Sequence, residues 1–348
     1  MTDRRTLVMA ILFSLSPMVL IGQEVFEVRQ ADVNSSFRAV SVVNNEVAWV
    51  AGSNGFVGLS LDGAENWNFM RIPGHDSSQF RSIYAFDERT AVVANAGSPA
   101  VILRTENQGE SWSEVYRDQN PAAFIDGLDF WNETAGMAYG DPKDGRLNII
   151  KSEDAGKTWT EDLSDSRPLL SEGEASFAAS GTGIRTYPPC LTMISTGGKL
   201  SRLFKSHDCG VSWEEVTAIM LKGPETSGIF SSHFKDDLNG IVVGGDYTQT
   251  EEKSDHIFIT KDGGQNWRQP ENPTRGYREC VEHIVGSTWM AIGPTGIDIS
   301  YDDGMNWKPF SNQRGFHVIR RARNGELIVL AGSNGKTANF HVSQFKSK

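Results

Sequence analysis

Three features of the sequence predict an all-β protein folded as a seven-bladed β-propeller of four-stranded blades. A box of eight residues recurs six times, successive boxes lie about one blade apart, and the chain ends in strand-like segments without a box. The 348 residues are 39% hydrophobic and include 35 Gly, which supplies both a large core and many turns. We expect one propeller domain over residues 23–348.

Each box has Ser or Thr two residues before Asp, Gly two residues after it, and Trp at its end. Asn107 replaces the Asp once and Ala64 replaces the Gly once. The Ser, Thr and Asp oxygens can accept hydrogen bonds from the backbone of a tight turn, and the Gly suits a positive φ. We therefore expect each box to form a tight turn between two strands. The boxes end at Trp67, Trp112, Trp159, Trp213, Trp267 and Trp307.

Strand-like apolar runs lie upstream of each box, as at residues 37–43 and 47–51 before the first one. Each repeat therefore has two strands, a third strand that leads into the box, and a fourth after the Trp. One N-terminal run, at residues 25–30, has no blade of its own. A seventh blade that combines it with three C-terminal strands would close the ring and leave no free sheet edge. These three runs lie at residues 316–321, 327–331 and 338–345.

The first 22 residues are predicted to be a secretory signal peptide. Arg4 and Arg5 precede an apolar run over residues 7–21, and a polar sequence follows Gly22. The alternative is an uncleaved anchor, but about 15 apolar residues with a Pro among them fall short of the roughly 20 that span a bilayer. We expect cleavage near Gly22, a periplasmic or secreted chain, and no stable membrane insertion after cleavage.

The boxes resemble the Asp box, or bacterial neuraminidase repeat, in which the box is a structural turn remote from the active face. Further stretches resemble a widespread bacterial family related to the plant photosystem II stability and assembly factor. That resemblance covers the mature chain and implies a seven-bladed propeller that acts as a scaffold. Some relatives carry labels such as oxidoreductase or glycosyl hydrolase, but most have no established activity. The similar stretches lie at residues 140–145, 173–182, 228–230, 244–247 and 293–300.

A binding site is expected on the face opposite the boxes, where the links between blades and the turns between second and third strands lie. Arg38, Arg81 and Arg278 each follow an aromatic residue at the start of an innermost strand, and His317 is their counterpart in the last blade. Arginines gathered in an acidic protein favour a carboxylate, sulfate or phosphate ligand, which guanidinium groups bind through paired hydrogen bonds.

Loop acids are expected on the opposite side of this central site. They come from the third to fifth blades and are Asp141, Glu174 and Asp246. Glu174 is included among the ligand-binding candidates. The alternative is that each arginine pairs with one of these acids, which would leave a self-neutralised rim without a ligand.

Charge and spacing argue against several other functions. The chain has 33 Lys and Arg against 44 Asp and Glu, a net charge of −11, which disfavours nucleic acid as a partner. Cys190, Cys209 and Cys280 lack metal-site or redox spacing, and the seven His form no close pair, so no metal and no cofactor is expected. Three Cys leave at least one thiol free, so packing must hold the fold.

Two functions are consistent with these features. The first is a non-enzymatic binding or assembly scaffold for a protein partner or an anionic glycan. The alternative is a carbohydrate-active enzyme, either a sialidase-like glycoside hydrolase or a polysaccharide lyase, that holds a carboxylate on its arginines. A retaining hydrolase needs a nucleophile and a separate acid, for which Tyr247 with Asp141 or Asp246 are the candidates and Tyr187 is a spare aromatic residue.

Overall fold

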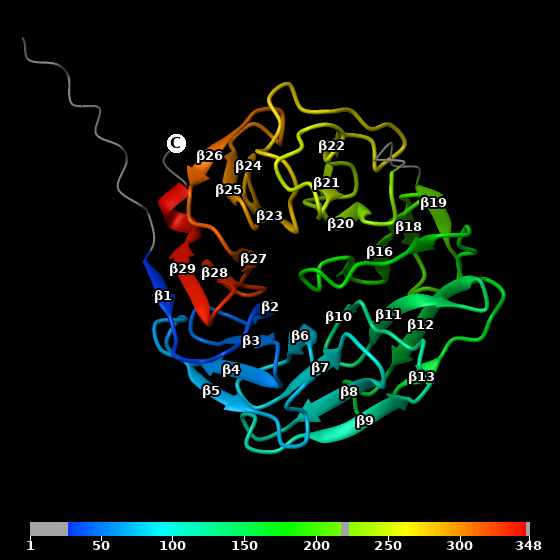
Figure 1. Ribbon diagram of the computed structural model, residues 1–348, viewed down its shortest axis with the longest axis vertical. Coiled ribbons are helices and arrows are strands. Elements are labelled where there is room, and N and C mark those ends of the chain that lie inside the picture. Colours follow the sequence, from blue (N-terminus) through cyan, green and yellow to red (C-terminus); the bar gives the residue numbers. More distant parts are fainter. Residues whose placement is uncertain (1–26, 217–222, 346–348) are drawn as a thin grey trace, which may run out of the picture.

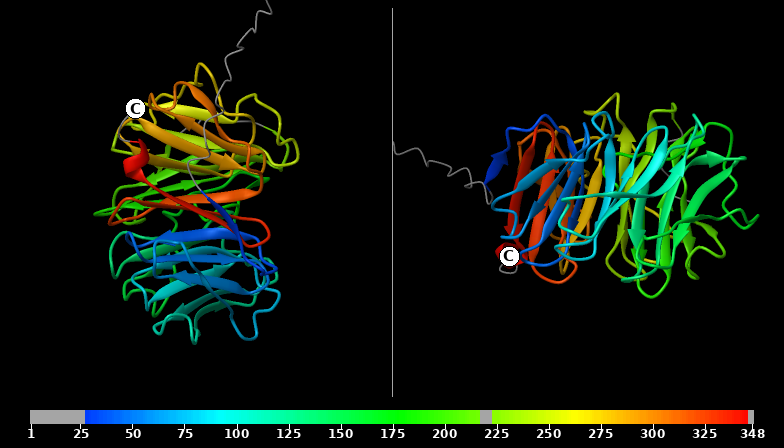
Figure 2. Two further views of the ribbon diagram at one scale, coloured as in Figure 1. Left: turned by 90° about the vertical axis from the view of Figure 1, so that its left-hand side faces the viewer. Right: turned by 90° about the horizontal axis from the view of Figure 1, so that it is seen from below.

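The protein is a ring of seven β-sheets around a central axis, which confirms the predicted fold (Figure 1). The computed structural model describes residues 27–216 and 223–345, so the predicted signal peptide lies outside the described residues. Seen edge-on, the ring is a thick disc with turns on both of its faces (Figure 2). No helix in the described part of the chain is long and apolar enough to cross a membrane.

Six blades follow one another along the chain, each with its first strand near the axis. Blade 1 consists of β2 (Phe37–Val42), β3 (Ala48–Gly52), β4 (Phe56–Ser60) and β5 (Asn68–Arg71). Blade 2 consists of β6 (Phe80–Ala85), β7 (Ala91–Asn95), β8 (Ala100–Thr105) and β9 (Ser113–Asp118). Blade 3 consists of β10 (Gly127–Phe130), β11 (Gly136–Lys143), β12 (Arg146–Ser152) and β13 (Thr160–Glu161).

The remaining blades depart from this pattern at blade 5, where two short strands are added at the inner edge and the outer strand is reduced to a single bridge between Ile259 and Arg268. Blade 4 consists of β15 (Ile184–Tyr187), β16 (Leu191–Ser195), β18 (Leu203–Ser206) and β19 (Glu214–Val216). Blade 5 consists of β20 (Ser227–Phe234), β21 (Gly240–Asp246) and β22 (Ile257–Thr260), with β14 (Glu174–Ala175) and β17 (Gly197–Gly198) beside β20. Blade 6 consists of β23 (Cys280–Val285), β24 (Thr288–Gly293), β25 (Gly296–Ser300) and β26 (Trp307–Ser311).

The last blade closes the ring as predicted. It consists of β27 (Phe316–Arg321), β28 (Leu327–Gly332), β29 (Lys336–His341) and the N-terminal β1 (Val28–Gln30), in which Arg29 pairs with Thr337. The expectation of a strand over residues 338–345 is wrong at its end, because the chain turns into a 3-10 helix at Val342–Phe345. Val342 and Phe345 are buried there and join the core between blades 6 and 7, so burial decides the conformation.

The box geometry is that of the predicted turn. In the first box, Ser60 Oγ donates to Asp62 Oδ1 (2.9 Å) and accepts from the N–H of Ala64 (2.9 Å), while Asp62 accepts from the N–H of Asn66 (2.9 Å). Gly63 and Ala64 have φ values of 77° and 67°, and every other box also has two consecutive residues with positive φ. The other boxes repeat these hydrogen bonds.

A disulfide that the sequence did not predict joins Cys190 to Cys209, whose Cα atoms lie 4.5 Å apart. Cys190 is in the turn between the first two strands of blade 4, and Cys209 is in the box of the same blade. The bond therefore confirms that these two kinds of turn share one face of the disc. Cys280 is a free, buried thiol in β23.

We expect a mature protein that lacks β1 to unfold at a clearly lower temperature than the full mature chain, because its loss exposes the edge of β29. Thermal unfolding followed by circular dichroism measures the difference. A chain that lacks only residues 23–26 is the control, since it keeps β1. Truncated and control proteins that melt within about one degree of each other would contradict this account of closure.

Trp159→Ala should lower the free energy of unfolding by about 3–5 kcal/mol, as for other buried Trp truncations. Trp159 is 8% exposed, belongs to the core between blades 2 and 3, and donates its indole N–H to the carbonyl of Gly156 (3.1 Å). Trp67→Ala is the matched control, because Trp67 occupies the same place in another box but is half-buried. Chemical denaturation measures both, and equal losses would show that burial is not the cause.

Candidate functional site

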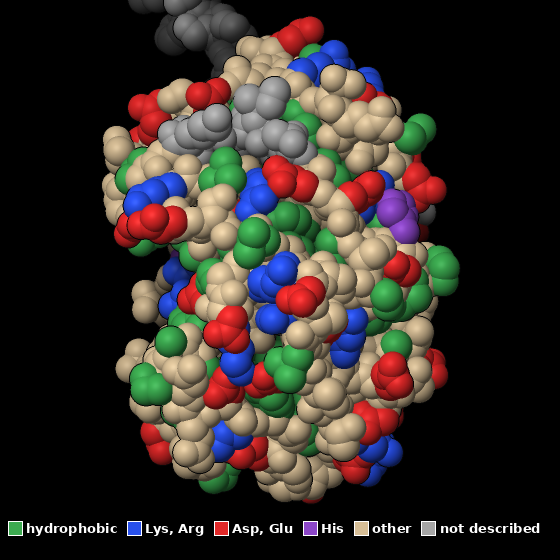
Figure 3. All heavy atoms as spheres, turned by 90° about the vertical axis from the view of Figure 1, so that its right-hand side faces the viewer, with side chains coloured by type: hydrophobic (Ala, Val, Ile, Leu, Met, Phe, Trp, Pro, Cys, Tyr) green, Lys and Arg blue, Asp and Glu red, His purple; other side chains and the backbone are tan. Residues whose placement is uncertain are grey.

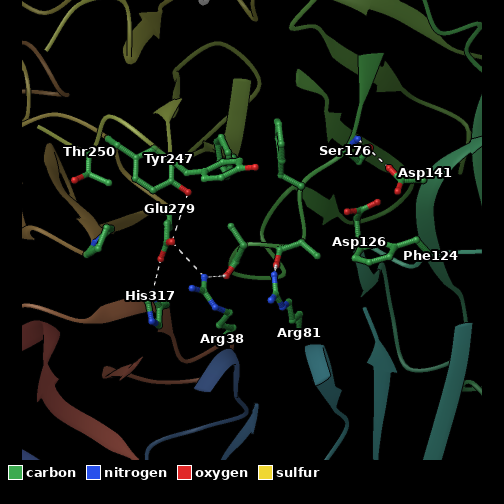
Figure 4. Close-up of a pocket in the computed structure, with 16 residues that line it drawn as sticks. Arg38, Arg81, Phe124, Asp126, Asp141, Ser176, Tyr247, Thr250, Glu279 and His317 are labelled. Atoms are coloured by element: carbon green, nitrogen blue, oxygen red, sulfur yellow. Dashed lines mark hydrogen bonds and ion pairs between the residues drawn. The ribbon is translucent and has the colours of Figure 1, made fainter. Parts of the chain in front are cut away.

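A depression of about 520 Å³ opens at the centre of the disc, on the face opposite the boxes (Figure 4). Its walls come from the starts of innermost strands, from links between blades, and from the ends of second strands, which all share that face. The box turns lie at the far ends of the third strands. The prediction that unusual side chains gather opposite the boxes therefore agrees with the structure.

Four innermost strands carry a β-bulge near their start, and the extra residue of each lines the depression. These residues are Arg38, Arg81, Phe230 and His317. A bulge kinks its strand and redirects the side chain of its extra residue. Asp126 and Glu279 hold the corresponding places before β10 and β23, and they also line the depression.

Arg278 does not match Arg38 and Arg81, and that prediction is wrong by one residue. The glycines that end the second strands show the correct alignment of blades 6 and 7. A Cβ on Gly293 would meet the carbonyl of residue 277 and the Cα of Arg278. A Cβ on Gly332 would meet the carbonyl of residue 315 and the Cα of Phe316, so Arg278 and Phe316 are equivalent. Arg278 therefore occupies the buried place of the aromatic residue, and Glu279 occupies the place of the arginines.

The Arg278 side chain is fully buried beside the depression and does not open into it. Its Nε donates to Asp298 Oδ2 (3.0 Å), and its Nη1 donates to Thr295 Oγ1 (2.8 Å). Its positive charge is thus neutralised inside blade 6. The predicted group of three arginines is reduced to Arg38 and Arg81.

Arg38 belongs to a buried network of charges. Its Nη1 lies 3.2 Å from Glu279 Oε1, while Glu279 Oε2 lies 2.5 Å from His317 Nδ1. Burial raises the pKa of Glu279, but His317 and then Arg38 outweigh that effect and hold the pKa below its ordinary value. The Arg38 side chain is 23% exposed and forms the outer end of this network.

Arg81 has no acidic partner among the described residues. Its Nη1 donates to the carbonyl of Ala178 (3.0 Å), and its Nε is buried without a hydrogen-bond partner. Burial, and then the neighbouring Arg38, lower the pKa of Arg81. An anion bound beside Arg81 would compensate for the burial of its charge and for the repulsion from Arg38, since a buried charge is stable only when it is paired.

The link between blades 3 and 4 passes through the centre of the ring. We call residues 176–182 the crossing segment. It accepts a hydrogen bond from Arg38 Nη1 at Ala179 (3.0 Å), and Ser180 Oγ donates to the carbonyl of Glu279 (2.8 Å). The crossing segment thus forms the floor of the depression.

Aromatic rings cover one wall of the depression. Phe177 of the crossing segment stacks on Phe230 with ring centroids 4.2 Å apart, and Tyr277 meets Phe230 edge-on at 4.9 Å. Tyr247 packs against Phe177 and Phe230 and is 49% exposed. This wall offers apolar contact beside the arginines.

The predicted acids divide into one that lines the depression and two that do not. Asp141 lines it. Glu174 is buried away from it, where it accepts from Arg202 Nε (3.0 Å) and Thr196 Oγ1 (2.6 Å). Asp246 accepts from the backbone and side chain of Thr248 within its own turn.

Of the candidate catalytic residues, Tyr247 and Asp141 line the depression and Asp246 does not. Tyr247 lines the depression, but among the described residues no hydrogen bond joins its hydroxyl to a carboxylate. Tyr187 does not line the depression. It ends β15 in blade 4, where its hydroxyl accepts a hydrogen bond from the N–H of Phe234 (2.9 Å). No group of three or more His, Cys, Asp or Glu within the described ranges could hold a metal ion.

Sequence reasoning missed Asp126 and Glu279, which hold ring positions equivalent to those of the arginines. The signal was present in the glycines that end second strands. Gly140, Gly293 and Gly332 each lie against the backbone just before the redirected residue. An alignment on these glycines, rather than on the aromatic residues, would have found both acids.

Comparison with known proteins agrees with this architecture. The profile of a family described as photosynthesis system II assembly factor YCF48 matches residues 21–172. Among solved structures, YCF48 bound to a D1 peptide has a TM-score of 0.68 at 15% identity, covering 92% of this chain and 98% of that one. YCF48 from Cyanidioschyzon merolae has a TM-score of 0.66 at 14% identity, covering 91% and 99%.

A sialidase from Bacteroides fragilis (strain YCH46) is 23% identical over 295 residues, which cover 73% of this chain. The chain spans about half of that relative, 48% of its length. The family profile covers less than half of the chain, and the YCF48 structures agree with its seven-bladed fold. The chain is therefore a seven-bladed propeller with repeats of the bacterial neuraminidase type, similar to the photosystem II assembly factor.

Proposed function

We propose that this protein is a non-enzymatic scaffold that binds a segment of a protein partner in the central depression. The proposal rests on Arg81, which lines the depression without an acidic partner among the described residues. A carboxylate of the partner, bound beside Arg38 and Arg81, would supply the missing charge. The aromatic wall would receive apolar side chains of the same segment.

The relative with a bound D1 peptide supports a peptide as the ligand. The depression is also open enough for an extended segment, because its floor is the crossing segment and its mouth faces solvent. An anionic carbohydrate could meet the same arginines, and the sialidase relative favours that alternative. Tyr247 and Asp141 lie on opposite sides of the depression (Figure 4), and Asp246 is hydrogen-bonded within its own turn, which argues against turnover of such a sugar.

We also propose a periplasmic or secreted location. The N-terminal sequence has the features of a signal peptide. The Cys190–Cys209 disulfide supports the same location, because such bonds persist outside the reducing cytosol.

When the full chain is expressed in a bacterium with a secretion pathway, we expect a product shortened by about 22 residues. Intact mass measures the cleavage, and alkylation before and after reduction measures the thiols. One thiol should react in the unfolded, unreduced protein and three after reduction. A full-length cytosolic product with three free thiols would contradict the proposed location.

Arg81→Ala should weaken binding of acidic peptides about tenfold or more, since a hydrogen bond to a charged group contributes about 1.5–3 kcal/mol. The probes are labelled ten-residue peptides that each carry one Glu among apolar residues, and fluorescence anisotropy measures their affinity. Arg117→Ala is the matched control, because Arg117 pairs with Glu114 on the outer strand β9.

Sialyllactose and other anionic oligosaccharides serve as the competing probes, with products followed by chromatography. Peptide binding that is lost in Arg81→Ala and kept in Arg117→Ala supports the scaffold. Saturable sugar binding without product would replace the peptide with a glycan. Turnover of a sugar, or peptide binding that is unaffected by Arg81→Ala, would overturn the proposal.

A further inference from the structure

The part of the depression formed by blade 3, next to Arg81, carries two carboxyl groups that form no ion pair among the described residues. Asp126 is 1% exposed, and neither of its carboxyl oxygens has a hydrogen-bond partner. Asp141 is half-buried and accepts one long hydrogen bond, 3.5 Å, from the N–H of Ser176. Figure 4 shows the Asp126 carboxyl directed into the depression with Asp141 beside it.

A third polar group at the same place also lacks a partner. Ser176 is 7% exposed, its Oγ has no hydrogen-bond partner, and it lines the depression next to Asp141. Buried polar groups are nearly always hydrogen-bonded, and leaving one unpaired costs roughly 1–3 kcal/mol. An unpaired hydroxyl and an unpaired carboxyl at one place therefore point to a ligand that donates hydrogen bonds.

The fold fixes these groups in place. Asp126 occupies the redirected position before β10, equivalent to Arg38 and Arg81. Asp141 follows Gly140, where a Cβ would lie 1.8 Å from the carbonyl of Phe124, so β11 lies directly against the link that carries Asp126. Because only glycine allows this approach, the two carboxyl groups are held side by side.

Electrostatics favours a cation between them. Burial raises the pKa of both carboxyl groups, and the nearby Asp141 raises that of Asp126 further. Arg81 acts on Asp126 in the opposite sense, but it donates its hydrogen bond to the crossing segment and not to this carboxyl. A bound cation would therefore relieve a repulsion that the protein leaves in place.

We infer that Asp126, Asp141 and Ser176 form a subsite for a basic group, the ammonium of Lys or the guanidinium of Arg, on the bound segment. The inference rests on the proposed function for the identity of the ligand as a peptide. An ammonium has three hydrogen-bond donors, which two carboxylates and one hydroxyl can accept together. The depression would then select segments that present an acidic and a basic side chain a few residues apart.

The first experiment uses ten-residue peptides that carry one Glu and, two to five residues away, Lys, Arg or norleucine, each with an acetylated N-terminus. Lys or Arg at the best spacing should tighten binding about tenfold relative to norleucine. A second set with a free N-terminus distinguishes a side chain from the terminal ammonium as the source of the charge. Fluorescence anisotropy measures all affinities.

Asp141→Asn is the informative variant, because the amide oxygen can still accept the N–H of Ser176 while the charge is lost. It should abolish the tenfold preference for Lys or Arg over norleucine. Asp144→Asn is the matched control in the same hairpin, since Asp144 is exposed and its φ of 56° suits Asn. Asp126→Asn should act like Asp141→Asn.

A direct probe separates this inference from the proposed function. N-acetyl-lysine methylamide and its norleucine counterpart are titrated into the full mature chain and followed by NMR. Saturable binding of the lysine compound that Asp141→Asn removes would support the subsite, even if acidic peptides fail to bind. Acidic peptides that require Arg81 but show no preference for Lys or Arg would overturn the subsite and leave the proposed function intact. If neither peptides nor the lysine compound bind, both fail.

Discussion

Closure of the ring is the constraint on which the rest of this structure depends. Each blade buries both of its faces against its neighbours, as the wholly buried β3, β7, β24 and β28 show. Such faces are stable only if no blade lacks a neighbour, and the pairing of β29 with β1 completes the last blade. The box turns then hold the outer strands, and a buried Trp fills the gap between sheets.

The closed ring leaves one place where side chains of all blades can meet. Bulges near the starts of four innermost strands, and the corresponding positions before two others, turn six side chains toward the axis, and the crossing segment closes the channel beneath them. Charge is distributed unevenly among the six, with arginines in two adjacent blades and an unpaired acid in the next. On the outer edge shown in Figure 3, by contrast, acidic and basic side chains are mixed and hydrophobic side chains form small groups.

Almost all of the fold could be predicted from the sequence, but only half of the site. The boxes identify the blades because every copy needs the same Ser or Thr, an Asp (Asn107 in one copy) and the same positive φ. No repeated motif marks which residue of each innermost strand faces the axis. Arg278 was therefore assigned the position that Glu279 occupies, and Asp126 was missed. The disulfide between Cys190 and Cys209 also required the structure, since it joins two turns that only the blade brings together.

The closing blade also fixes the order in which the molecule can be completed. Arg29 of β1 hydrogen-bonds Asn339 of β29 at a distance of 2.7 Å, although the two residues are 310 positions apart. During synthesis β1 leaves the ribosome before the first six blades and β29 leaves it after them, so the first strand must stay unpaired while those blades form. β1 has only three residues and a partly polar sequence. Both features suit a strand that stays unpaired during synthesis, since a short strand is a poor template for pairing with the wrong strand. The ring can therefore close only after the last blade has been synthesised, because a chain that stops earlier has no strand with which β1 can pair.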